Sequence, residues 1–178
     1  MLERVTTLAP ATSISAACAN LDQFVFIEAT AMAQMVGFAW QGDPQAPADY
    51  RGLLKAYIRS QVTGCPLPVS NGHSEPSIYE GGRGNLAFRF WHDLTHVRLH
   101  RAFDLDGEVE VANAQLDVLA AAGFGAGSLE YELFHADTLG QTLCGVATGD
   151  FPQDQLCFAR LSLESSLTLA IRAELGKS

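Results

Sequence analysis

The sequence predicts an all-α fold, a single-domain bundle of about five or six helices with a long loop rich in glycine and proline. Apolar residues recur every three or four positions along most of the chain, as on one face of a helix. Clusters of glycine and proline separate these segments, and no stretch alternates apolar and polar residues over a useful length. With 178 residues, 48% hydrophobic and 17% charged, the chain can build one well-packed core.

The N-terminal region, residues 1–19, shows no helical or alternating pattern, so we expect a poorly ordered arm followed by one helical domain over residues 20–178. Threonine, serine and proline interrupt its apolar residues, which argues against a signal peptide. The chain has no run of about eighteen apolar residues that would span a bilayer. These features predict a cytoplasmic protein without a membrane partner.

The first predicted helix covers residues 20–40, with Asn20 as its cap, and Glu28 falls near the middle of its apolar face. A second helix is expected over residues 48–62. Residues 63–85 contain so many glycines and prolines that we predict a loop, placed across one end of the bundle. Loops of this length are uncommon in compact domains and are usually functional or mobile.

The third predicted helix, residues 85–103, carries three of the five histidines. His92, His96 and His100 are four residues apart, so they form a row on one helical face together with Phe88 and Phe103. A buried imidazole without a partner costs about 1–3 kcal/mol. This face therefore predicts an internal polar or metal site.

Three further helices are expected, over residues 108–122, over residues 128–148 and from residue 153 onward, with a turn before each. Several polar residues fall on or beside their apolar faces. These residues are Glu108, Gln115, Glu132, His135, Asp137 and Gln141.

Antiparallel packing allows the heights of these residues in the bundle to be compared. With turns centred near residues 105 and 125, His96, Gln115 and His135 fall in one layer. His100, Glu108 and Gln141 fall in another layer about 10 Å away. We therefore predict one or two divalent metal ions, zinc, iron or manganese, in the interior. The predicted ligands are Glu28, His92, His96, Glu132 and His135, with Glu108 as an outlying candidate. Asp93, Gln115, Asp137 and Gln141 are expected to support these ligands without binding the metal.

This pattern partly resembles the ferritin-like di-metal carboxylate proteins, in which two helices each supply a glutamate and two supply Glu-x-x-His. Glu132 and His135 form one such motif, Asp93 and His96 form another with aspartate in place of glutamate, and Glu28 is a single carboxylate. The resemblance covers about five residues and implies a di-metal site. It does not extend to Glu108.

The stretch that begins at His92 also shares features with two other motifs. Asp93 stands where HExxH metalloproteases carry glutamate, and its side chain is one methylene shorter. The dipeptide His92-Asp93 also resembles HD-type phosphohydrolases, with His73 and either Asp104 or Asp137 in the remaining roles. This second resemblance rests on the dipeptide alone.

The function class that follows is a metal-binding helical bundle, a metal-dependent hydrolase or oxidoreductase acting on a small molecule. The alternative is a non-enzymatic acidic module that binds a basic protein, its polar core groups fixing helix register. The net charge of −9 argues against binding nucleic acid by charge attraction. The four cysteines lack metal-site or disulfide-scaffold spacing, so we expect reduced thiols.

Overall fold

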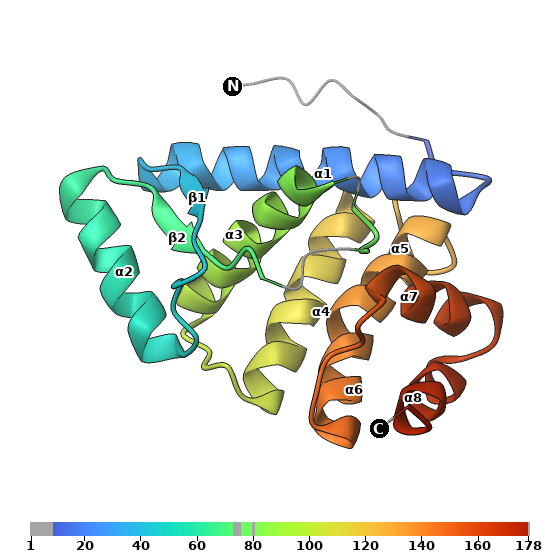
Figure 1. Cartoon of the computed structure of the whole chain (residues 1–178). Helices are drawn as coiled ribbons and strands as arrows, with labels where there is room; N and C mark the ends of the chain where they lie inside the picture. The colour runs from blue at the N-terminus through green and yellow to red at the C-terminus, as the bar shows by residue number, and fades with distance from the viewer. Residues whose placement is uncertain (1–8, 73–75, 80, 178) are drawn as a thin grey trace.

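The all-α prediction is confirmed by the computed structural model, which describes residues 9–72, 76–79 and 81–177 (Figure 1). The helix α1 (Ile14–Val36) runs along one side of the molecule, and α3 (Gly82–Leu99) and α5 (Leu129–His135) pack against it (Figure 1). The elements are α1 (Ile14–Val36), β1 (Trp40–Gly42), α2 (Tyr50–Thr63), β2 (Leu67–Val69), α3 (Gly82–Leu99), α4 (Leu105–Ala121), α5 (Leu129–His135), the π-helical turn η1 (Ala136–Gly140), α6 (Gln141–Thr148), α7 (Gln155–Glu164) and α8 (Leu167–Leu175).

The first helix begins earlier than the sequence pattern predicts. Its cap is Ser13, whose hydroxyl accepts from the backbone N–H of Ala16, and the helix continues through the expected cap Asn20. The segment 14–19 lacks an obvious apolar stripe, yet its small residues fit closely against the core, where Ala17 and Cys18 are buried. Residues 14–19 of the predicted arm are therefore helical, and residues 1–8 lie outside the described residues.

The predicted loop over residues 63–85 is shorter and more structured than expected. The three-residue strand β2 pairs in parallel with β1, with Trp40 opposite Leu67 and Gly42 opposite Val69. Such short strands show no readable alternation in the sequence. At the other end of the loop, α3 begins at Gly82, before the expected cap Asn85.

The segment after the glycine-rich turn at residue 125 forms one long helical rod interrupted by η1 (Figure 1). In a π-helical turn one extra residue is accommodated, which shifts the side chains that follow around the axis, and such turns often occur at functional sites. Here the turn carries Asp137 and Thr138, both buried. The last predicted helix is divided at Ser165 and Ser166, and Ser166 caps α8.

The core lies between α1, α3 and α5, where the rings of Trp91 and Phe24 meet edge to face at 5.6 Å and Trp91 also contacts Phe134. Aromatic pairs of this kind add about 0.5–1.5 kcal/mol beyond the burial of their surfaces. Because Trp91 anchors one side of α3 in the core, the neighbouring side of the helix, with His92, is directed toward α4. None of the described helices combines the length and apolar character needed to span a bilayer.

Candidate metal centre

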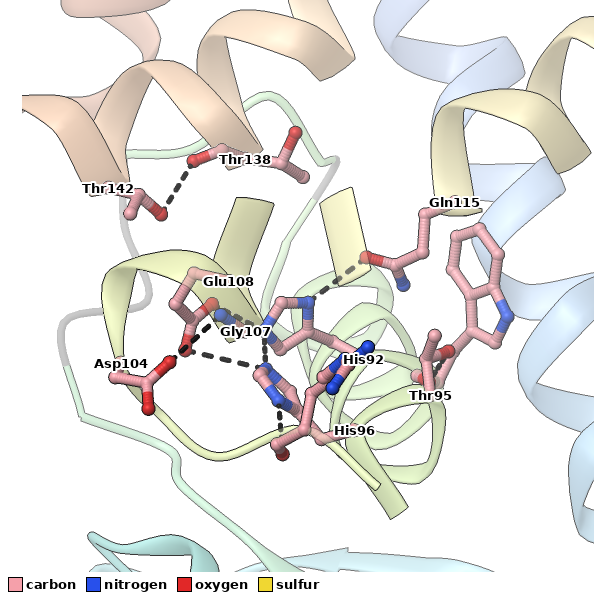
Figure 2. A network of polar contacts seen from close by, with 11 residues as sticks. His92, Thr95, His96, Asp104, Gly107, Glu108, Gln115, Thr138 and Thr142 are labelled. Atoms are coloured by element: carbon pink, nitrogen blue, oxygen red, sulfur yellow. Dashed lines mark hydrogen bonds and ion pairs between the residues drawn. The ribbon is translucent and has the colours of Figure 1, made fainter. Parts of the chain in front are cut away.

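The helices α3 and α4 position the candidate centre. His92 and His96 lie one turn apart on α3, and Glu108 lies in the first turn of α4 (Figure 2). Asp104 caps α4 by accepting from the backbone N–H of Gly107 at 2.9 Å. Gly107 has to be a glycine, since an added Cβ would collide with the backbone carbonyl of Ala102. This tight start of α4 brings the carboxylate of Glu108 onto the histidines.

Three side chains converge on one point. The Nε2 atoms of His92 and His96 are 3.1 Å apart. One carboxylate oxygen of Glu108 lies 3.2 Å from Nε2 of His92, and the other lies 3.4 Å from Nε2 of His96 (Figure 2). Among the described residues, this group of two imidazoles and a carboxylate could hold a metal ion.

The other nitrogen of each imidazole has a partner of its own. Nδ1 of His96 lies 3.0 Å from the backbone carbonyl oxygen of Arg101, which can only accept a hydrogen bond, so this Nδ1 carries a proton. Nδ1 of His92 lies 3.0 Å from Oε1 of Gln115 and donates to it in this amide orientation. In the neutral rings, both Nε2 lone pairs therefore face each other and the Glu108 carboxylate. Three acceptors in contact require a cation, either a proton or a metal ion.

The pKa shifts of His92 and Glu108 also indicate that the group needs a cation. Burial lowers the pKa of His92, but the hydrogen bond and the charge of Glu108 outweigh it, so that this pKa is raised overall. Burial raises the pKa of Glu108, but hydrogen bonds from His92 and His96 and their charges outweigh it and bring this pKa to about 2. Without a metal, the ionised carboxylate of Glu108 therefore favours a proton on the imidazole of His92.

A pocket of about 660 Å³ opens beside this group, between α3, α4 and the η1–α6 segment. His92 and Glu108 line it, whereas His96 lies behind them and is fully buried. Pockets that bind small organic ligands typically measure about 300–1,000 Å³. A cation held by the three side chains would therefore have protein on one side and the pocket on the other.

Two of the other carboxyls that line the pocket have raised pKa values. Burial raises the pKa of Asp93 to about 6, although the charges of His92, His96 and Arg89 lower it. Burial raises the pKa of Asp137 to about 7, against opposing effects of Tyr79, Arg89 and Gln141.

Asp137 accepts a hydrogen bond of 2.7 Å from Nε2 of Gln141. The pocket thus combines a metal-ligand group with carboxyls that titrate near neutral pH, a combination typical of functional sites.

Among the ligands predicted from sequence, His92, His96 and Glu108 come together, and the structure does not bring Glu28, Glu132 or His135 into their group. Glu132 instead accepts from the backbone N–H of Gly127 at 3.1 Å.

Of the four supporting residues, Gln115 contacts His92, while Asp93, Asp137 and Gln141 line the pocket. Sequence reasoning missed Arg89 and Tyr79. Arg89 shares its helical side with the histidines, but its contact with Ser70 depends on the fold.

The predicted separation of Glu108 from His96 by about 10 Å is wrong. The helix α3 ends at Leu99, and His100 takes a left-handed conformation with φ 55°. The turn before α4 is therefore centred near residue 102, not 105, which gives His96 and Glu108 equal distances along the chain from its centre. The same early end removes His100 from the histidine row and leaves it exposed.

The chain matches no protein-family model, no curated protein and no solved structure with which we compared it. The possible chemistry of the centre is therefore inferred from its own residues.

Proposed function

We propose that this protein is a metal-dependent hydrolase whose single divalent ion is held by His92, His96 and Glu108. The observation that carries the proposal is the convergence of two imidazole Nε2 atoms and a carboxylate at 3.1–3.4 Å, with the Nδ1 atoms directed to other partners. In tetrahedral zinc sites with metal–ligand bonds of about 2.0–2.1 Å, ligand atoms lie about 3.3 Å apart. The spacing of the three groups is close to that of such a site, with one carboxylate oxygen of Glu108 beside each histidine.

The donor set also supports catalysis. Structural zinc sites are closed by four protein ligands, whereas catalytic sites use three, such as two histidines and a glutamate, and leave one position open. Here the group has three donors, and two of them line the pocket. Hydrogen bonds from Nδ1 of each histidine fix the ring orientation, as is usual around metal ligands.

A bound divalent ion would supply Lewis acidity and lower the pKa of a water molecule in the open position. The chain itself would orient the substrate and move protons. Asp93 lines the pocket directly after His92 in the sequence, outside the ligand group, and is the carboxylate that we assign as proton acceptor. Phe88 and Phe103 cover the sides of the imidazoles, with ring centroids 5.5 Å from His92 and 4.7 Å from His96, and restrict water.

Oxidation is the second candidate, because two histidines and one carboxylate with open positions are also the ligand set of non-haem iron(II) oxygenases. The identity of the metal that supports turnover separates the two. Zinc excludes the redox role, whereas a strict requirement for iron(II) and dioxygen favours it.

The metal content of the untagged protein, purified without chelator, tests the proposal. We expect about one zinc, iron or manganese ion per chain, and an affinity at least tenfold lower in Glu108→Gln. The matched control is Asp117→Asn, which removes one charge from an exposed position of the same helix. If the wild-type protein stays metal-free after incubation with each ion, or if Glu108→Gln binds as tightly as the control, the metal centre is refuted.

Hydrolysis needs a separate assay. A panel of chromogenic esters and anilides should show turnover that disappears with chelator and returns with metal. The variant Asp93→Asn should bind metal normally but lose at least about tenfold in kcat, since general-base catalysis contributes about 10²–10⁴-fold. Full activity in Asp93→Asn would remove this residue from the mechanism.

A further inference from the structure

The pocket wall formed by η1 and α6 is rich in hydrogen-bond acceptors. Asp137 and Gln141 on this wall are both more than nine-tenths buried, and one of the two amide N–H groups of Gln141 is donated to Asp137. Within the part of the chain that the structure describes, Oε1 of Gln141 receives no hydrogen bond. An amide oxygen that lines a pocket and has no protein donor can accept a hydrogen bond from a ligand N–H.

The two threonines of this wall, Thr138 and Thr142, also present acceptors to the pocket. The hydroxyl of Thr138 donates to the backbone carbonyl of Phe134 at 2.8 Å. The hydroxyl of Thr142 donates to the backbone carbonyl of Thr138 at 3.2 Å, as Figure 2 shows. Each hydroxyl donates its only proton within the helical segment, so it can act only as a hydrogen-bond acceptor toward the pocket. The hydroxyls of this wall therefore offer only acceptors to the pocket, and its amide offers an oxygen beside its second N–H.

The charged side chains of the pocket are mostly acidic. Besides His92, the cationic side chain that lines the pocket is Arg89, which donates to the backbone carbonyl of Ser70 at 2.9 Å. Its charge lowers the pKa of Asp93 and of Asp137. The pocket carboxyls are Asp93, Asp104, Glu108, Asp137 and Asp150. Even with a divalent ion on Glu108, the carboxylates outweigh the cations. This balance disfavours phosphate esters and carboxylates and favours neutral or positively charged ligands.

The remaining surface of the pocket is apolar and partly aromatic. Phe88 and Phe103 lie on the inner side, and Phe151 and Val146 lie at the rim with 58% and 64% of their surfaces exposed. Aromatic faces attract cations and bury hydrocarbon at the same time. Exposed apolar side chains at a pocket mouth are typical of contacts with an apolar ligand body.

We propose that the pocket recognises a small organic amine, with its N–H groups bonded to Gln141 and Asp137 and its apolar body against the phenylalanines. The inference deepens the proposed function by naming a group that a substrate of the same site would carry beside its hydrolysable bond. It rests on that function only for the reaction, because binding of the amine requires the pocket and not the metal.

The test uses chelator-treated full-length protein at pH 7.5 and two probes of similar size and opposite charge, 2-phenylethylammonium and 3-phenylpropanoate. Binding is followed through amide chemical shifts in two-dimensional NMR spectra. We expect saturable shifts around η1 and α6 with the ammonium ion, and an affinity at least tenfold above that of the carboxylate. Equal or tighter binding of the carboxylate, or no saturable shift with the ammonium ion, would overturn the proposal.

Two variants localise the binding. At Gly145, on the pocket wall, an added Cβ would have only the carbonyl oxygen of Asp150 nearby, at 3.9 Å, so Gly145→Leu should fold normally and fill the pocket. It should weaken ammonium binding at least tenfold, with Thr142→Leu as the second variant if Gly145→Leu unfolds. Unchanged binding in a folded variant places the amine elsewhere and refutes the proposal. Metal stoichiometry, measured separately, reports on the proposed function, so that the two failures are distinguishable.

Discussion

Replacing Asp137 with asparagine should remove a large pH dependence from the stability of the metal-free protein. Asp137 is 7% exposed, and its burial raises the pKa of its carboxyl from 3.8 to about 7. A carboxyl whose pKa is raised in the folded state binds its proton more tightly there than in the unfolded chain. Its stabilising effect is complete below pH 3.8 and is lost as the pH rises through about 7.

The size of the effect follows from the shift. One pKa unit corresponds to about 1.4 kcal/mol, so a rise of about three units amounts to about 4 kcal/mol in the free energy of unfolding. About 3 kcal/mol of this falls between pH 5 and pH 8. The asparagine variant cannot titrate, and the effect of its altered hydrogen bond with Gln141 is the same at both pH values.

Urea denaturation at pH 5 and pH 8, with chelator present, measures this difference. The stability of Asp137→Asn relative to wild type should improve by about 3 kcal/mol from pH 5 to pH 8. Because Asp93 titrates in both proteins, its contribution cancels. The exposed replacement Asp117→Asn should show no such change. A relative stability of Asp137→Asn that is equal at the two pH values would refute the reasoning that burial dominates the pKa of this carboxyl.

Three further outcomes are expected. Gln115→Leu removes the acceptor of His92 Nδ1 and should lower zinc affinity by about 10–100-fold in a competition titration; an unchanged affinity would contradict its orienting role. Zinc affinity should also fall at least about tenfold from pH 7 to pH 5, because the proton that Glu108 stabilises on His92 must leave before metal binds, and a flat profile would speak against these ligands. Gly107→Ala should lower the free energy of unfolding by about 1–3 kcal/mol, because the added Cβ clashes with the backbone carbonyl of Ala102. The control Gly82→Ala has open space around the added Cβ and should not lower it. Equal stabilities of the two variants would contradict the clash.

The sequence by itself was sufficient for the fold class and for part of the centre. Helical periodicity is local, so the all-α class and the pairing of His92 with His96 on one face could be predicted from neighbouring residues alone. The cost of burying an unpartnered imidazole identified this face as a site. Asp137 and Gln141 could be assigned supporting roles from their places beside the apolar face, but the hydrogen bond between them was not predicted.

The third ligand could be decided only by the tertiary structure. Whether Glu108 reaches the histidines depends on where α3 ends and how tightly the chain turns. A shift of three residues in the centre of the turn changes the residue opposite His96 by six positions, which is about 9 Å along the helix axis. The pocket likewise depends on the π-helical turn that directs Asp137 and Gln141 toward α3 and α4, which leaves no periodic signal in the sequence. Local spacing determines which residues share a helical face, whereas turn geometry and helix packing decide which faces meet.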